Sequence, residues 1–310
     1  MDSLPPLQKI LVPTDLSDLS MHALEWADRI ADRSDGEIHA LKILEPPGEM
    51  LFDPEGDLLE VEEYDMGQLE LERKNDEEGI AKWASQARNP VITNVQVGRA
   101  VEDTLRYVHE NGIELIVMGT HGMQGTWEWL AGSVAEKMVR YSNAPVLSIK
   151  NRPREDPIDR ILLASDLEDP EERGSKGAIE EQVKAASSEY ELPGSELQSI
   201  GVLKTLRRLF EADLYLLTVR GEKEDPKALE EGMERFIKTN ELEDVQKHVE
   251  VNEDVEEGIL NFVQARGIDL IAIGSHGFNG WKKLFHHSVS EDIVEHLPFP
   301  VLTYRIGEGA

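Results

Sequence analysis

Four small residues on one segment have the types and spacing of a phosphate-binding loop. Two residues separate Gly119 from Gly122, and nine separate Gly122 from Gly132, which Ser133 follows. Glycines allow positive φ and let the backbone approach a ligand closely. Unpaired amides at the start of a helix, with a dipole charge of about +0.5, favour phosphate oxygens, to which the Ser133 hydroxyl can also donate. The pattern lacks Gly-Lys-Ser/Thr and is therefore not a P-loop.

A second segment with useful side chains is Pro13-Thr14-Asp15, at the end of the short apolar run Lys9–Pro13. This run is predicted to be a buried strand. Ile113–Met118 is the most apolar run of the first half and predicts another strand, which the glycine segment follows. In parallel sheets the ligand crevice lies beyond the carboxyl ends of the strands, where the winding reverses. We expect both segments to meet there.

The other elements of the first half alternate between strands and helices. Apolar positions at helical spacing start at Ala23 and again at Val101, and Gly112 closes the second helix. Residues 45–64 are predicted to form an acidic, breaker-rich loop before a helix that runs through Trp83. Apolar strands that alternate with amphipathic helices predict a parallel, doubly wound sheet covered on both faces. The remaining predicted strands are Glu37–Leu44, Val91–Val97 and Ala144–Ile149.

The second half of the chain repeats the first, which indicates duplication of a whole domain. Three pairs of segments carry the repeat, at offsets of 155, 151 and 176: Gly112–Gly122 with Gly267–Gly277, Ile10–Leu16 with Ile161–Leu167, and Glu37–Ile43 with Asp213–Val219. We expect a first domain over residues 1–150, a linker over 151–157, and a second domain over 158–310. The second domain carries a partly helical insertion at 168–195.

Composition restricts the class of protein. The chain has 310 residues, of which 32 are Lys or Arg and 62 are Asp or Glu, so the net charge is −30, divided equally between the halves. This field repels phosphate backbones and anionic lipid, and it argues against a nucleic-acid or membrane binder. The absence of cysteine excludes disulfides and thiolate metal sites. No apolar window approaches the ~18 residues of a membrane span, and no secretory signal is visible, so we expect a cytoplasmic protein.

With these motifs the chain resembles the universal stress protein family in its tandem, two-domain form. The resemblance covers almost the whole chain apart from 45–64 and 168–195, and its most specific element is the Gly-two-Gly-nine-Gly-Ser signature. It implies two α/β domains with doubly wound parallel sheets, Rossmann-like and adenine nucleotide alpha hydrolase-like. It also implies stress-linked regulation, binding of an adenine nucleotide, typically ATP, and pairing of the domains through their last strands, Pro145–Ile149 and Pro300–Tyr304.

The same resemblance implies which residues of the first domain contact the nucleotide. Asp15 would meet the ribose, which the backbone of Met118 and Gly119 would flank. The nine-residue loop contains no Lys or Arg, so Mg²⁺, or Lys137 and Arg140 on the following helix, are candidates for assisting the outer phosphates. The resemblance assigns the other positions as follows: Pro13, Thr14 and Ile43 line the adenine pocket, and Gly122, Gly132, Ser133 and Val134 surround the phosphates.

The second copy departs from the signature. It keeps Gly274 and Gly277, but His287 stands at the third glycine position, before Ser288. A Cβ and an imidazole there occupy the place where backbone should touch phosphate, so this copy is predicted to be degenerate for ATP and kept for its fold. A protonated His287 would attract an anion, which leaves a weaker, pH-dependent site open.

Simpler explanations of the same residues remain open. Ser133 and Ser288 each begin a capping box, so capping alone would explain both. Asp15 would also serve simply to start the helix near Ser17. Four histidines, at 276, 286, 287 and 296, suggest a metal site, but they lack matching carboxylates and metal binding is disfavoured. The acidity is also typical of growth in high salt.

The favoured function is a nucleotide-dependent regulator. The alternative is a stress-response scaffold that binds no nucleotide and uses its insertions for recognition. No nucleophile with an adjacent base is identifiable, so no catalysis is predicted, although slow ATP hydrolysis stays open. Adenylate transfer is disfavoured because the chain lacks a Ser-Gly-Gly pyrophosphate loop. Whether two chains form a homodimer is also left open.

Overall fold

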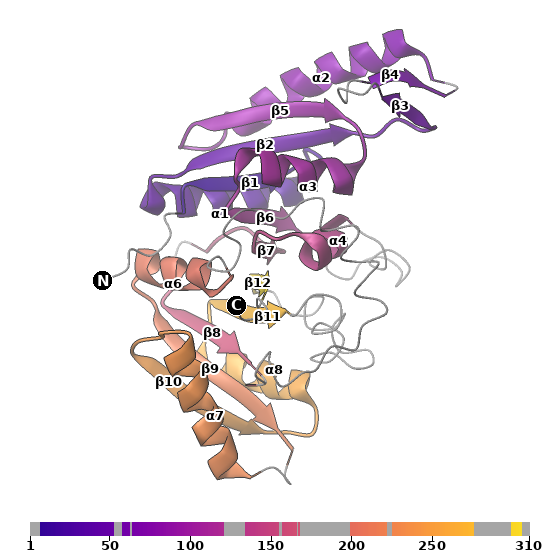
Figure 1. The fold of residues 1–310 in the computed structure, drawn as a ribbon. Coiled ribbons are helices and arrows are strands. Elements are labelled where there is room, and N and C mark those ends of the chain that lie inside the picture. Colours follow the sequence, from indigo (N-terminus) through magenta and orange to yellow (C-terminus); the bar gives the residue numbers. More distant parts are fainter. Residues whose placement is uncertain are drawn as a thin grey trace.

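The two halves of the chain build one continuous ten-stranded sheet (Figure 1). The strand order is β10-β9-β8-β11-β12-β7-β6-β1-β2-β5, and a separate hairpin pairs β3 with β4. The structure is a computed structural model, and it describes residues 7–52, 58–62, 64–120, 134–154, 157–165, 167, 199–221, 225–275 and 299–305. Within each half the neighbouring strands are parallel and alternate with helices along the chain, which confirms the predicted α/β class.

The first domain occupies the indigo to magenta part of Figure 1. Its elements are β1 (Lys9–Pro13), α1 (Asp18–Ser34), β2 (Glu37–Leu44), β3 (Met50–Phe52), β4 (Leu58–Val61), α2 (Met66–Ala84), β5 (Val91–Val97), α3 (Ala100–Asn111), β6 (Leu115–Gly119), α4 (Val134–Tyr141) and β7 (Val146–Ile149).

The second domain follows the same plan. Its elements are β8 (Arg160–Ala164), α6 (Ser199–Phe210), β9 (Asp213–Arg220), α7 (Pro226–Thr239), β10 (Val245–Val251), α8 (Val255–Arg266), β11 (Leu270–Ser275) and β12 (Val301–Arg305). The insertion predicted at 168–195 lies outside the described residues.

The strand registers of the two domains correspond. Ile10 pairs with Ile38, and at the offsets of the repeat Ile161 pairs with Leu214. The strands that close each domain agree in the same way, since β6–β7 and β11–β12 have equivalent registers. The repeat seen in the sequence is therefore a repeat of strand pairing.

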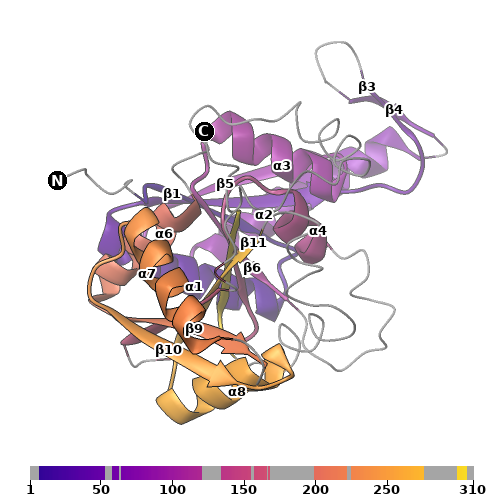
Figure 2. The same ribbon diagram turned by 60° about the horizontal axis from the view of Figure 1, so that its bottom comes forward.

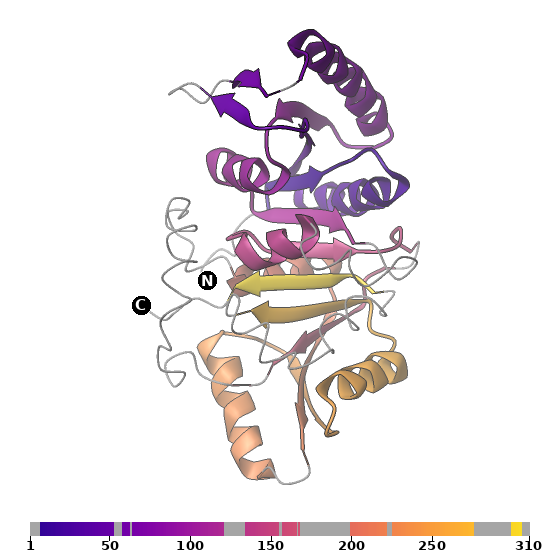
Figure 3. The same cartoon turned by 90° about the vertical axis from the view of Figure 1, so that its right-hand side faces the viewer.

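The domains join through their last strands, as predicted. β7 and β12 pair antiparallel, with Leu147 opposite Leu302, so the sheet continues from one domain into the other (Figure 3). Both leucines are fully buried. Burying a leucine side chain stabilises a fold by roughly 1.5–3 kcal/mol, so this pair contributes strongly to the junction.

The helices cover both faces of the sheet, as Figures 1 and 2 show from two sides. Alternate residues of each strand point to opposite faces, and on the face covered by α1 and α6 they form one core that runs through both domains. Arg33 of α1 lies over the ring of Phe210 of α6, 4.7 Å from its centroid. On the opposite face, α3 and α4 cover one cluster and α8 covers another. Among the described residues, the cores of the two domains are therefore joined on one face and form separate clusters on the other.

Local sequence explains where the helices of the first domain begin and end. The Ser17 hydroxyl accepts a hydrogen bond from Ser20 N at 3.2 Å, which is an N-cap for α1. Gly112 follows α3 in the left-handed region, with φ of 62°, a conformation that glycine adopts at little cost. The predicted helix end at Gly112 is confirmed.

The segment 45–64 is not only a loop. It contains the antiparallel hairpin β3–β4, which projects from the outer end of the first domain (Figure 2). Pro46, Pro47 and Gly48, which helped to suggest a loop, lie just before β3, and Gly48 has φ of 115°. Apolar residues after them pair as strands, and Val61 is buried.

Two predicted strand starts were too early. β6 begins at Leu115 instead of Ile113, because Ile113 N donates to Val108 O and thus completes the end of α3. β7 begins at Val146 instead of Ala144, since Ala144 N donates to the hydroxyl of Ser142 at 3.1 Å. Ile113 and Ala144 are buried nonetheless, so burial alone did not distinguish strand from turn. None of the helices in the described ranges is long and apolar enough to cross a membrane.

Candidate functional site

The winding of the first domain reverses between β1 and β6. From β1 the chain goes on to β2 and β5 on one side, and it then returns to β6 and β7 on the other. Ligands of such sheets bind outside the carboxyl ends of the strands at this switch point. The structure therefore places Pro13-Thr14-Asp15 at the end of β1. The neighbouring strand β6 ends with Met118 and Gly119.

Strands β1 and β6 stop pairing before either of them ends. In the described structure two residue pairs join them, and the second is Leu11 with Ile116. By contrast, β1 stays paired with β2 through Pro13, and β6 stays paired with β7 through Gly119. The two strands are not paired over their last residues, and we call this place the β1–β6 divergence.

The segments beyond the strands continue in opposite directions. Thr14 N donates to Leu41 O of β2 at 2.9 Å, while Thr120 N donates to Ile149 O of β7 at 2.8 Å. The backbone that follows each strand is thus hydrogen-bonded to the strand on its outer side, β2 for β1 and β7 for β6.

Pro13 provides a physical reason for the divergence. Residues of a strand direct their backbone groups alternately to the two neighbouring strands, and Lys9 O accepts a hydrogen bond from Glu114 N on the β6 side. Lys9, Leu11 and Pro13 therefore face β6. Because proline has no N–H, the ladder toward β6 loses its donor at Pro13.

The loop after β1 is held by hydroxyl groups. Thr14 Oγ1 accepts from Leu16 N at 2.9 Å and donates to Ser20 Oγ at 2.8 Å, and Thr14 is buried. These bonds hold Leu16 in the left-handed region, with φ of 66°. A leucine there is strained, and it persists only where its surroundings determine the conformation. The backbone that presents Asp15 is therefore rigidly placed.

Asp15 is exposed, and its carboxylate has a structural partner. Asp15 Oδ1 accepts a hydrogen bond from Ser17 N at 3.0 Å. Partial burial would raise the pKa of this carboxyl, but hydrogen bonds from Ser17 and Ser20 outweigh that effect and hold the pKa below its ordinary value. Asp15 is thus ionised at neutral pH and is suited to accept hydrogen bonds from hydroxyl groups. The same contact supports the simpler interpretation that Asp15 shapes the start of α1.

Gly119 is needed for packing at the end of β6. A Cβ at this position would lie 2.4 Å from Leu19 Cγ of α1, which is far inside van der Waals contact. The helix consequently approaches the strand end as closely as a bare backbone allows. A nucleotide role for Gly119 adds to this requirement and does not replace it.

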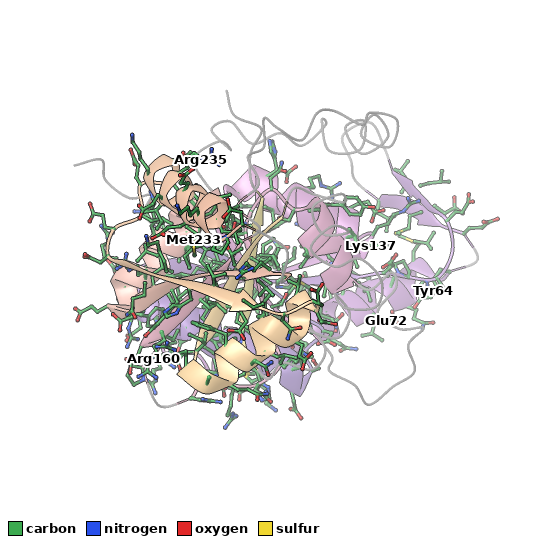
Figure 4. The ribbon with its side chains drawn as sticks, turned by 90° about the horizontal axis from the view of Figure 1, so that it is seen from below. Tyr64, Glu72, Lys137, Arg160, Met233 and Arg235 are labelled. Atoms are coloured by element: carbon green, nitrogen blue, oxygen red, sulfur yellow. The ribbon has the colours of Figure 1, made fainter. Side chains whose placement is uncertain are left out.

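The other described candidates lie either on the face of the sheet covered by α3 and α4 or on α4 itself. Ile43 and Met118 both pack on the cluster under α3 and α4, and Met118 is buried. Val134 is the first residue of α4 and is exposed. Lys137 is exposed on the same helix (Figure 4). The side chain of Arg140 is not described.

The most specific part of the signature lies outside the described residues. It comprises Gly122, Gly132 and Ser133, and the histidines considered for a metal lie outside them as well. In the part of the chain that is described, no group of three His, Asp or Glu side chains is arranged to hold a metal ion.

Sequence reasoning missed two residues that shape this site. The strained Leu16 and the close neighbour Leu19 carry no chemistry, so their types did not attract attention. One signal was present for Leu16, because the repeat places Leu167 at the same position, and that residue also has a positive φ of 59°. A leucine that follows a hydroxyl residue and an aspartate in both copies indicates a backbone requirement.

Comparison with known proteins identifies the family. The model of the universal stress protein family matches residues 6–150 and again residues 157–305. The chain belongs to the universal stress protein family. It carries two such domains in tandem, each with the adenine nucleotide alpha hydrolase-like fold.

Individual relatives match either one domain or the whole chain. Two universal stress proteins of Methanocaldococcus jannaschii are 30% and 29% identical over 154 and 155 residues, which is 48% and 47% of this chain and 85% and 96% of theirs. A solved universal stress protein from Archaeoglobus fulgidus is similar over 97% of this chain and 98% of its own, with a TM-score of 0.64 and 22% identity. That similarity concerns the tandem fold.

Proposed function

We propose that the first domain binds an adenine nucleotide, typically ATP, at the β1–β6 divergence, and that the chain acts as a nucleotide-dependent regulator in the stress response. The observation that carries this proposal is the early end of β1–β6 pairing, beside the strand that leads into Gly119. Universal stress proteins bind nucleotides such as ATP or cAMP. We also place the protein in the cytoplasm.

Each described residue has a defined part in this proposal. The ionised Asp15, held by Ser17, accepts hydrogen bonds from the ribose hydroxyls. The start of α4 at Val134 directs the positive end of its dipole toward the phosphates. A backbone cradle suits a chain of net charge −30, because it needs no cluster of lysines.

A magnesium ion fits this site only as a companion of the nucleotide. The described residues offer no cluster of metal ligands, and Mg²⁺ is commonly bound through substrate phosphates with few protein carboxylates. In this proposal Mg²⁺ offsets the charge of the outer phosphates. No catalytic step is proposed.

The second domain is proposed to be mainly structural. Its strand β12 completes the shared sheet, and its third signature position is His287 in place of glycine. A side chain at this position would take the space that the phosphates need.

A rival function is that of a scaffold without nucleotide. The hairpin β3–β4 favours it, because Leu51 and Leu59 are 59% and 62% exposed on an element that projects from the domain. Exposed apolar side chains on a projection are suited to contact a partner protein. In this case the stress response would depend on the hairpin and not on a ligand.

Calorimetric titration with ATP, ADP and AMP distinguishes the two functions. We expect one nucleotide per chain in the parent protein and no measurable binding in Gly132→Val, since the added side chain excludes the phosphates. Circular dichroism and thermal melting show whether the variant is folded.

The matched control is His287→Val, which places the same side chain at the equivalent position of the second domain. It should leave affinity and stoichiometry unchanged. A parent protein that binds none of the three nucleotides, or a folded Gly132→Val that binds as well as the parent, would overturn the proposal and favour the scaffold.

A further inference from the structure

The ten-stranded sheet ends in two outer strands, β5 in the first domain and β10 in the second (Figure 1). Each pairs with one neighbour, β5 with β2 and β10 with β9. Within the described residues, neither strand makes a backbone hydrogen bond on its outer side. An outer strand with unpaired backbone groups is open to pairing with another chain.

Only one of these two strands carries charged side chains. In β10 these are Lys247 and Glu250, and Lys247 forms an ion pair with Glu230 of α7 at 3.7 Å. By contrast, residues 89–98, which contain β5, include no Asp, Glu, Lys or Arg, in a chain of which 30% is charged. Charged residues, lysine in particular, are a common means of preventing contact between sheet edges. The edge at β5 lacks this protection.

The outward backbone groups of β5 belong to alternate residues. Gly98 N donates to Leu44 O of β2 at 3.1 Å, so Gly98 and every second residue before it direct their backbone groups toward β2. The residues that direct both N–H and C=O outward are therefore Val91, Thr93, Val95 and Val97.

The side chains of β5 are partly uncovered. Val91 and Val95 pack on the core that runs through both domains, so Ile92 and Asn94 lie on the other face of the strand. Ile92 is 47% exposed. Asn94, the central residue of β5, is half-buried, and its side-chain amide has no hydrogen-bond partner among the described residues. The strand thus offers an apolar side chain and an unpaired amide next to its open edge.

We propose that β5 is the interface of a symmetric dimer, in which β5 of one copy pairs antiparallel with β5 of a second copy around Asn94. Opposite residues of an antiparallel pair exchange two hydrogen bonds where their backbone groups face each other. With the two-fold axis at Asn94, outward residues meet outward residues. Val91 then lies opposite Val97 of the second copy, and Thr93 lies opposite Val95.

The sequence of β5 suits this register. The opposed outward residues are all β-branched, a type that packs well between neighbouring strands. The two copies of Asn94 form a pair without backbone hydrogen bonds, in which side chains are closest. Because an amide side chain has both a donor and an acceptor, each Asn94 satisfies the other.

A second copy is the partner that this edge fits, since the chain already joins its own domains in the same way. Leu147 of β7 lies opposite Leu302 of β12, and the offset of 155 makes them equivalent positions of the repeat. The domains thus pair edge to edge around an approximate two-fold axis. Pairing of β5 with β5 continues the same sheet into a second copy, and it places no charge opposite an uncharged strand.

Net charge opposes this association and gives it a characteristic salt dependence. Each copy carries −30, so two copies repel each other. The distance over which charges act falls from about 10 Å at 0.1 M salt to about 3 Å at 1 M. The dimer should therefore become tighter as salt is added. The inference goes beyond the proposed function and requires no nucleotide.

Analytical ultracentrifugation of the full-length protein, at 0.1 and 1 M KCl without nucleotide, tests the proposal. We expect a monomer–dimer equilibrium whose dissociation constant is about threefold or more lower at 1 M KCl. Val95→Pro removes one outward N–H and leaves the ladder to β2 intact, so it should weaken the dimer about tenfold or more.

The matched control is Val249→Pro, at the equivalent position of β10. Val249 also faces outward, because Asn252 N donates to Arg220 O of β9. This variant should dimerise as the parent does. Circular dichroism and thermal melting show whether both variants are folded.

Single cysteines test the register independently, since the chain contains none. Asn94→Cys should form a cross-linked dimer on mild oxidation with diamide. Its Cα atoms would lie about 4.5 Å apart across the axis, within the roughly 4.4–6.8 Å that a disulfide spans. Gln96→Cys lies on the same face, but its two copies would be four residues apart in register, about 13 Å, so it should not cross-link.

The proposal is overturned if the parent is monomeric at both salt concentrations, which would leave the edge to a strand of another protein. It is also overturned if association weakens at 1 M KCl, if folded Val95→Pro dimerises as tightly as the parent, or if Val249→Pro abolishes the dimer. Cross-linking of Gln96→Cys as efficient as that of Asn94→Cys would contradict the register.

Discussion

The two domains share their strand registers, yet they differ at one place, where the winding reverses. In the first domain β1 and β6 pair over two residues and then diverge. In the second domain the equivalent strands β8 and β11 pair over four residues, through Ala164 and Ile273. The repeat places Ala164 at the position of Pro13. The second domain has an N–H where the first has none, so its ladder continues.

This difference shows that the two domains share their strand order and the loop after their first strand, and that they differ in strand pairing at the proposed nucleotide site. A strained leucine is present in both domains, at 16 and at 167, and the backbone N–H of each donates to the hydroxyl two residues earlier, at 14 or 165. That loop therefore belongs to the fold. The divergence of the strands belongs to one domain only, the same one that carries the intact glycine signature.

The largest expected effect is on stability, and it tests whether the two domains contribute equally to the junction between β7 and β12. Leu147→Ala and Leu302→Ala should each destabilise the protein by about 2–5 kcal/mol, because both side chains are fully buried and face each other across the junction. Chemical denaturation measures the change. Effects that differ by more than about twofold between the variants would show that the junction is not energetically symmetric.

The next largest effect tests whether Pro13 causes the early end of β1–β6 pairing. Pro13→Ala restores the N–H that faces β6, so we expect β1–β6 pairing to extend and nucleotide affinity to fall about tenfold. Ala164→Pro removes the corresponding donor in the second domain and should cost about 1–2 kcal/mol of stability, roughly one buried hydrogen bond.

Amide hydrogen exchange at residues 13 and 117–119 reports the pairing, and calorimetry reports the affinity. Unchanged exchange and unchanged nucleotide affinity in Pro13→Ala would remove proline as the cause of the divergence.

A smaller effect is expected from the hydroxyl groups after the first strand of each domain. Thr14→Val should cost about 1–2 kcal/mol, since Thr14 both accepts from Leu16 N and donates to Ser20 Oγ. Ser165→Ala should cost about 1 kcal/mol, because its hydroxyl accepts from Leu167 N at 3.1 Å. Thr14→Ser keeps the hydroxyl and serves as the control. Equal losses in the two domains would mean that the bond to Ser20 contributes little.

The smallest expected effect comes from adding a methyl group to the helix glycine next to each strained leucine. A methyl group at Gly232 would lie 3.4 Å from Leu167 Cδ1, an ordinary contact, so Gly232→Ala should stabilise α7 by about 0.5–1 kcal/mol. At Gly79 the distance to Leu16 Cδ1 would be 3.0 Å, so Gly79→Ala should gain less because Leu16 must move. Thermal melting ranks the two variants, and the opposite order would contradict this account of the loop.

Much of the fold could be predicted from the sequence. The strands Lys9–Pro13, Glu37–Leu44 and Val91–Val97 have the predicted bounds, and the domains pair through their last strands as expected. The hairpin in 45–64 was missed because its strands are short and its breakers dominate the composition. Of the candidate site, Pro13, Thr14 and Asp15 were chosen from their place after a strand, and their nucleotide role stays a prediction.

The sequence by itself determined the repeat and the alternation of apolar strands and helices. These follow from local periodicity and from the similarity of the two halves. Only the tertiary structure decided that Pro13 faces β6 and that one core joins the domains on the face of α1 and α6. The physical reason is that the neighbour which a backbone N–H or a side chain meets depends on strand order and packing, which bring together residues far apart in the chain.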